Sequence, residues 1–304
     1  MNRSIRVMLA FCVLLAGVPV AATADTEADK PSYPSGASSA EKAALDDLAK
    51  LSEGALAYSR KGRIWKVEVG RWAPVELGKG EFVRWSADGS RLAVYDGGKV
   101  FVMDADGKNR TQLVDKAWKK DGASIEFHPN GKEVLFLRTD GVHAVHIETK
   151  NTRKLNAPGK YTGELCISAD GNLLAARWTH DLYLVDLKTG RHSKFARGCS
   201  PGVSPDGTLV MNNDGGHCTV TIRHVDSGKK RKIEATTCKP DGKWDNHHWS
   251  NHNDFIAAQG DGKGHYGYVL HVPTGRTFRL TWDGGVGYPD FFVGKALKAG
   301  DKGS

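Results

Sequence analysis

Short apolar stretches alternate with Gly-rich polar turns along most of the chain, from about residue 54 to residue 293. The stretch at 99–103 (Lys-Val-Phe-Val-Met) is apolar on both of its faces. Such stretches are typical of strands that are covered on both sides of their sheet. The pattern therefore predicts an all-β domain over this range.

One segment has helical periodicity instead. Residues 43–51 place Ala and Leu at roughly helical spacing, shortly after Ser38 and Glu41. Ser followed three residues later by Glu forms a capping box, which satisfies the first free N–H groups of a helix. We expect a short amphipathic helix at 39–52, packed against the side or base of the main domain.

The β region repeats itself. An apolar strand ends in Ser or His, an x-Asp-Gly or x-Asn-Gly turn follows, and a second strand begins. Gly suits such turns because it adopts positive φ without strain. Successive copies lie 36–47 residues apart, which is the length of a four-stranded propeller blade. The turns are at 86–89, 128–131, 168–171 and 204–207, with a degenerate copy at 250–254.

The two ends of the array complement each other. Residues 54–77 supply only three strands, and an additional strand is predicted at 288–293. Pairing this last strand into the first blade closes the ring and removes a free sheet edge. The prediction is an all-β, six-bladed β-propeller closed by the C-terminal strand. Its segments are a linker and short helix at 25–53, the propeller at 54–293 and a tail at 294–304.

These repeats resemble those of TolB-type propellers. The resemblance rests on the segment at 100–113, the Ser-x-Asp-Gly turns, and the sequences at 279–281 and 287–289. It implies a TolB-like propeller over about 54–293. Because only about 30 residues lie between the predicted signal and the first blade, we expect no counterpart of the separate α/β domain that precedes the TolB propeller. Propellers of this type serve as binding platforms, as enzymes and as gates on peptidases, so the resemblance leaves the function open.

The N-terminus has the form of a secretory signal. Arg3 and Arg6 precede an apolar stretch at 7–20, and Ala-Thr-Ala at 22–24 forms a cleavage site. We expect residues 1–24 to be removed before Asp25, which predicts a periplasmic or secreted protein with no transmembrane segment after cleavage.

Charge and composition exclude several classes. The chain has 304 residues with 43 Lys and Arg against 35 Asp and Glu, and its mean hydropathy of −0.44 excludes a polytopic membrane protein. The dense basic run at 229–232 follows a turn and is interpreted as a solvated hairpin tip, so no nucleic-acid partner is expected.

Four cysteines follow the predicted signal, and export makes them disulfide candidates with three possible pairings. None has the C-x-x-C spacing of a redox motif or zinc ribbon. The candidates are Cys166, Cys199, Cys218 and Cys238.

The loops on one predicted face of blades 4–6 gather His, Asp, Asn and Trp. Imidazole and carboxylate groups suit a divalent metal such as zinc, manganese or copper, and Trp suits the apolar face of a sugar. An alternative is that the pair at 247–248 begins a strand, with one ring wedged between blades. The candidate metal ligands are His180, His217, His248 and His265, and the candidate ligand-binding residues are Trp178, Asp214, Trp244, Asp245 and Asn246.

Two motifs are rejected on chemical grounds. Gly198 to Gly202 fit G-x-S-x-G, but Pro201 has no N–H for an oxyanion hole. His248 and His252 are four apart but lack the Glu of a metalloprotease helix.

The leading interpretation is an exported binding or scaffold module for an envelope protein, a peptide or a glycan. The alternative is a metal-assisted lyase or hydrolase on a carbohydrate-like substrate at the His-rich loops. Oligogalacturonate lyases, which are TolB-like propellers with a His-rich metal site, resemble this chain in that general sense but have seven blades. A third interpretation is a gate acting on a separate peptidase.

Overall fold

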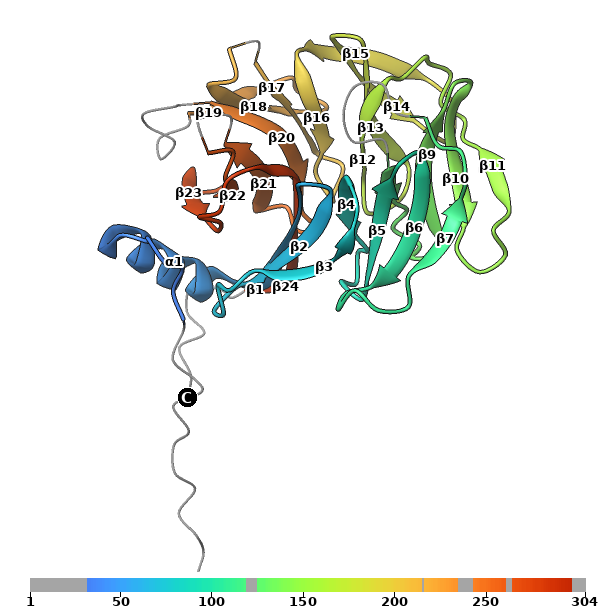
Figure 1. The fold of residues 1–304 in the computed structure, drawn as a ribbon. Coiled ribbons are helices and arrows are strands. Elements are labelled where there is room, and N and C mark those ends of the chain that lie inside the picture. Colours follow the sequence, from blue (N-terminus) through green and yellow to red (C-terminus); the bar gives the residue numbers. More distant parts are fainter. Residues whose placement is uncertain (1–31, 119–124, 215, 235–242, 261–263, 297–304) are drawn as a thin grey trace, which may run out of the picture. The chain divides into compact units, whose positions relative to one another are not determined.

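The computed structural model describes residues 32–118, 125–214, 216–234, 243–260 and 264–296. Over these residues it forms six four-stranded antiparallel sheets, which confirms the predicted six-bladed propeller. Figure 1 shows the sheets arranged around a common centre. Among the described elements, no helix is long and apolar enough to cross a membrane.

Each blade runs from an inner strand to an outer strand. Blade 1 contains β24 (Val286–Ala296), β1 (Ser52–Arg60), β2 (Arg63–Glu68) and β3 (Val75–Lys79). Blade 2 contains β4 (Phe82–Trp85), β5 (Arg91–Asp96), β6 (Lys99–Asp104) and β7 (Thr111–Val114). Blade 3 contains β8 (Ile125–Phe127), β9 (Glu133–Arg138), β10 (Gly141–His146) and β11 (Thr152–Lys154).

The remaining blades follow the same order. Blade 4 contains β12 (Gly163–Ile167), β13 (Leu173–Trp178), β14 (Asp181–Asp186) and β15 (His192–Arg197). Blade 5 contains β16 (Cys199–Val203), β17 (Leu209–Asn213), β18 (Thr219–His224) and β19 (Lys230–Glu234). Blade 6 contains β20 (Trp244–Trp249), β21 (Phe255–Gly260), β22 (Gly267–His271) and β23 (Arg276–Arg279).

The C-terminal strand closes the ring as predicted. β24 pairs with β1 along its length, with Phe291 opposite Leu56. Gly54 permits this pairing, because a Cβ there would collide with the backbone oxygen of Phe292. β24 continues to Ala296, and β1 begins at Ser52, so the first blade extends beyond the predicted limits of 54 and 293.

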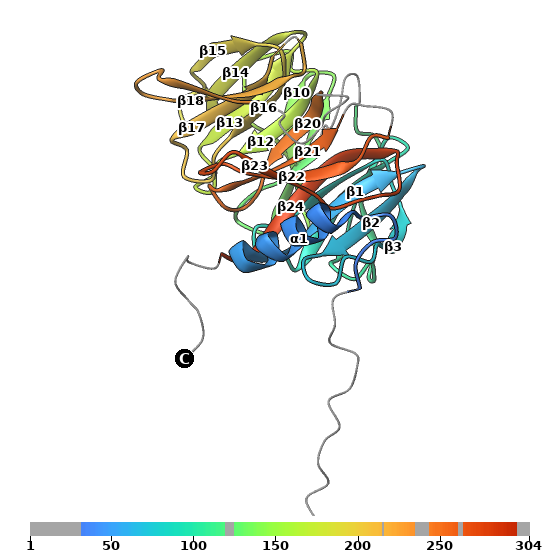
Figure 2. The same cartoon turned by 90° about the vertical axis from the view of Figure 1, so that its left-hand side faces the viewer.

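The predicted helix is present as α1 (Ser39–Leu51). Its capping box is formed, since the Ser38 hydroxyl accepts the Glu41 N–H at 3.3 Å and the Ser38 N–H donates to Glu41 Oε2 at 2.8 Å. Leu45 and Leu48 are fully buried in a cluster that includes side chains of blades 1 and 6. Figure 2 shows α1 beside β1 and β23, where it covers the blades that meet at the closure.

Each inner strand places one equivalent residue at the centre of the propeller. These residues occupy the same register position in every blade, opposite the second strand. Together they form what we call the central ring, which consists of Arg84, Glu126, Cys166, Gly202, His248 and Asp290.

Ion pairs in the central ring join blades that are distant in sequence. His248 Nδ1 lies 2.9 Å from Asp290 Oδ1, and its Nε2 lies 2.7 Å from Glu126 Oε2. Asp290 also accepts the backbone N–H of Trp85 at 2.7 Å, and Arg84 Nε lies 3.7 Å from Glu126. All four ionisable side chains are buried. Asp290 of blade 1 is therefore bonded to blades 6 and 2, the two neighbours that the closure brings together.

Electrostatics keep this ring charged. Burial and the Arg84 charge oppose protonation of His248, but the carboxylates of Glu126 and Asp290 outweigh them and hold its pKa well above 6.5. Burial acts against ionisation of Asp290, and the His248 charge and hydrogen bond reverse this and hold the carboxyl pKa below 3.8. The Asp290 carboxylate therefore contributes its full stability above its unfolded pKa, and this contribution is lost as the pH falls through its folded pKa. The His248 imidazolium contributes its full stability below pH 6.5, and this contribution is lost as the pH rises through its folded pKa.

Replacing Asp290→Asn should therefore destabilise the propeller. The change leaves the His248 imidazolium with one carboxylate in a buried site, which costs about 3–5 kcal/mol. Urea unfolding at neutral pH measures the effect, with the exposed turn variant Asp226→Asn as the matched control. An unfolding midpoint for Asp290→Asn equal to that of the control would show that the ring does not hold the closure together.

Candidate functional site

One face of the propeller, which we call the link face, carries the turns between the second and third strands and the links between blades. Near the link face, the inner strands of blades 4, 5, 6 and 1 each contain a register shift next to a residue with positive φ. The four residues are Glu164 (54°), Ser200 (51°), Asn246 (49°) and Tyr288 (48°). In β4 the register is regular. Such β-bulges re-aim side chains and are frequent beside functional sites.

The bulged strands create a polar cluster at the link face. Glu164 Oε2 accepts the N–H of Ser200 at 2.9 Å and lies 3.0 Å from Arg177 Nε. Burial raises the pKa of Glu164 to about 7, and the Asp245 charge adds to this while Arg177 opposes it. Burial, followed by the Glu164 and Asp245 charges, also raises the pKa of Tyr288. Side chains of blades 4, 6 and 1 thus influence one another electrostatically.

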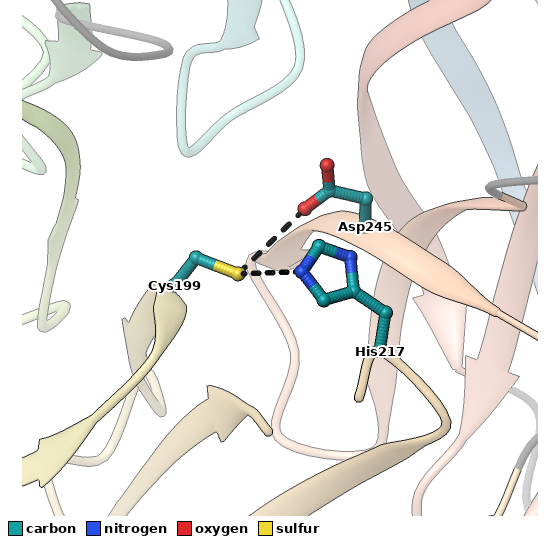
Figure 3. A group of neighbouring side chains, drawn as sticks. All are labelled: Cys199, His217 and Asp245. Atoms are coloured by element: carbon teal, nitrogen blue, oxygen red, sulfur yellow. Dashed lines mark hydrogen bonds between the residues drawn. The ribbon is translucent and has the colours of Figure 1, made fainter. Parts of the chain in front are cut away.

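Cys199, His217 and Asp245 converge at the junction of blades 5 and 6. Cys199 Sγ lies 3.8 Å from His217 Nε2 and 3.9 Å from Asp245 Oδ1, and the three ligand atoms all lie within 4.8 Å of one another. Figure 3 shows the three side chains pointing toward one another from separate segments. All three are partly buried. Burial, together with the Glu164 and Asp245 charges, raises the pKa of the Cys199 thiol to about 12.

Backbone contacts fix each member of this group. Cys199 pairs with Asn213, and Asp245 pairs with Gln259. His217 has φ of 58° in the turn between β17 and β18, where its N–H donates to the Asp214 carbonyl at 3.0 Å and its carbonyl accepts the Trp244 N–H at 2.6 Å. A left-handed conformation at a residue other than Gly is uncommon and is frequent at functional sites.

The predicted ligand residue Asp214 organises this turn. Its Oδ2 accepts the Thr219 hydroxyl at 2.6 Å and its Oδ1 accepts the Cys218 N–H at 3.2 Å. Asp214 therefore holds the segment that carries His217, with both carboxylate oxygens engaged.

The predicted aromatic residues differ in exposure. The Trp244 ring is 1% exposed and packs against His247 and Tyr268, so it presents no face for stacking. His247 is the ring wedged inside the blades, and burial, assisted by nearby His217, lowers its pKa to about 3. Trp178 is half-buried beside Tyr183, with ring centroids 6.1 Å apart.

The predicted histidine ligands lie in different places. His217 belongs to the Cys199 group, His248 to the central ring, and His180 is exposed at the turn after β13. His265 is also exposed, and its Nδ1 lies 2.8 Å from Gln259, which in turn accepts the Asn246 amide at 2.8 Å. Within the described ranges, His217 is the only one of the four that lies in a metal-like cluster.

The cysteines are free thiols wherever the structure describes them. Cys166 is buried in the central ring, Cys199 is partly buried, and Cys218 is exposed. Cys238 lies outside the described residues, so the disulfide pairing stays a prediction.

A hollow opens on the opposite face, around the Ser-x-Asp-Gly turns. This cavity of about 120 Å³ has apolar walls that include Trp85, Phe127 and Trp249. Glu126 and His248 of the central ring also line it. The charged ring thus borders the hollow on this face, while the polar cluster lies at the link face.

Sequence reasoning missed Glu164, Arg177 and Tyr288, and it assigned Cys199 only to disulfides. A signal was present, because Glu164, Ser200 and Asn246 each lie four residues before the Ser that begins a repeat turn. Aligning the repeats on that Ser would have placed them at one level of the propeller.

Fold and site together define a six-bladed propeller with a polar cluster on one face. No family model and no curated protein matches the chain. TolB from Acinetobacter baumannii is similar, with a TM-score of 0.60 and 15% identity over 78% of this chain and 66% of that chain. A protein of Agrobacterium tumefaciens assigned as TolB is also similar, with a TM-score of 0.57 and 15% identity. The match covers 78% of this chain and 91% of that chain. A chain of the nidogen–laminin complex is similar with a TM-score of 0.61 and 10% identity. The match covers 80% of this chain and 100% of that chain.

These similarities confirm a TolB-like propeller fold. At such identities the likeness concerns the fold alone, and this chain covers slightly less than two thirds of the Acinetobacter protein. The function therefore has to be argued from the residues of this chain.

Glu164→Gln should change how stability depends on pH. A carboxyl with a pKa of about 7 when folded and near 4.5 when unfolded binds its proton more tightly in the folded state, so its contribution to stability falls as pH rises between these values. The variant should gain up to about 3 kcal/mol relative to wild type between pH 4.5 and pH 8. Chemical unfolding of both proteins across this range measures the difference, and parallel pH curves would refute the raised pKa.

Proposed function

We propose that this protein is an exported binding module that holds a protein segment, a peptide or a glycan on the link face over blades 4–6. The observation that carries the proposal is the series of bulges on four consecutive inner strands, at Glu164, Ser200, Asn246 and Tyr288. A bulge repeated at one level turns a regular sheet edge into a set of polar groups that face a common space.

The chemistry of the cluster favours a ligand that supplies hydrogen-bond donors. Glu164 and Asp245 are carboxyl groups at the same end of the propeller, and the Asp245 charge raises the pKa of Glu164 while Arg177 and Arg84 lower it. Backbone amides of a peptide and hydroxyl groups of a glycan both provide such donors. The similar propeller folds support a binding role in general terms.

The geometry favours this function over a metal-assisted lyase or hydrolase built on the four predicted histidines. Both ring nitrogens of His248 lie at carboxylates of the central ring, and His180 is exposed at a turn. Four imidazoles at separate places do not form the single ligand set that such chemistry requires.

Export is part of the same proposal and rests on the predicted signal at 1–24. The N-terminus of the protein purified from the envelope or the medium of its host tests it. A mature chain beginning at Asp25 is expected, and an intact N-terminus at Met1 would contradict export by cleavage.

Peptide and glycan arrays test the binding role. Asn246→Ala and Tyr288→Phe each remove a polar group of the bulged level, so each should weaken binding of an array ligand by about tenfold or more. The control Asp226→Asn changes an exposed turn away from the link face and should bind as wild type does. Equal binding by all four proteins would exclude the link face as the binding surface.

A further inference from the structure

We propose that Cys199, His217 and Asp245 form a zinc site at the junction of blades 5 and 6. Thiolate, imidazole and carboxylate are all zinc ligands in proteins. The inference goes beyond the proposed function, because a metal site at this junction does not require any ligand on the link face.

The distances between the ligand atoms fit a tetrahedral ion. Zinc–ligand bonds of about 2.0–2.3 Å place neighbouring ligand atoms roughly 3.3–3.8 Å apart. Cys199 Sγ is 3.8 Å from His217 Nε2 and 3.9 Å from Asp245 Oδ1. The ligand atoms of His217 and Asp245 lie within 4.8 Å of each other, so these two side chains have to approach by up to about 1.5 Å around an ion, while Cys199 stays close to its present position.

The backbone around the three ligand residues also supports a metal site. Cys199 and Asp245 lie on neighbouring inner strands, each beside a bulge that brings its side chain to the link face. His217 comes from a turn and adopts an uncommon left-handed backbone, held by hydrogen bonds to Asp214 and Trp244. Three separate segments thus use irregular backbone to bring three different ligand types to one point.

The ligand types select among metals. Manganese prefers oxygen ligands, whereas a sulfur and an imidazole nitrogen favour zinc. Three protein ligands leave the fourth tetrahedral position open, as in catalytic rather than structural zinc sites. All three side chains are only partly buried, so a water molecule or an oxygen atom of a bound molecule can reach that position.

Metal analysis of the reduced, untagged protein tests the site. After dialysis against zinc, we expect one zinc per chain, removable by a chelator. Substitution by cobalt should give the near-ultraviolet charge-transfer band of a thiolate ligand. Cys199→Ser should abolish this band, and His217→Gln and Asp245→Asn should each lower zinc affinity by at least about tenfold.

Matched controls separate this site from its neighbours. Cys218→Ser removes the exposed thiol near the same turn, and His180→Gln removes an exposed imidazole, so both should keep full zinc content and the cobalt band. Circular dichroism of every variant should show the wild-type fold.

Three results would overturn the proposal. They are no stoichiometric zinc, a cobalt thiolate band that survives Cys199→Ser, or a disulfide that involves Cys199 in the protein purified without reductant. Array binding by protein that takes up no zinc would leave the proposed binding function standing while the zinc site fails, so the two proposals are tested separately.

Discussion

The structure depends on closing a ring of six similar blades with a strand from the far end of the chain. β24 has to reach β1 across almost the whole sequence, and backbone pairing alone specifies only that edge. Asp290 adds bonds to His248 and to the Trp85 N–H, which belong to the blades on either side. One carboxylate thereby connects three blades at the point where the ring is joined.

The central ring also explains why charge is tolerated at the centre of an apolar fold. A buried imidazolium is costly unless it is paired, and His248 has a carboxylate at each nitrogen. Glu126 belongs to blade 3, so the pairing spans the centre rather than a single junction. The result is a network that joins the inner strands of blades 1, 2, 3 and 6 at one level of the propeller.

Repetition made the fold predictable, and irregularity made the site difficult to predict. The Ser-x-Asp-Gly turns gave the blade length, and the three-strand first blade implied closure by the last strand. His217 and Asp245 were identified from loop composition. His248 could not be distinguished from them, because its separation depends on the bulge between Asp245 and His248, which no local pattern reveals. Glu164 and Tyr288 acquire their positions from bulges of the same kind.

Comparison of two histidines shows how position in the blade decides chemistry. His248 follows its bulge, lies in the buried ring and has both nitrogens committed to carboxylates, so it can act only as a structural cation. His217 lies in a turn, half-buried, with Nε2 directed at a sulfur atom instead of a carboxylate. A sulfur at 3.8 Å is a weak hydrogen-bond partner, yet the spacing suits two ligands of one ion. The same type of side chain therefore stabilises the fold as His248 in the central ring and is placed for metal binding as His217 at the link face.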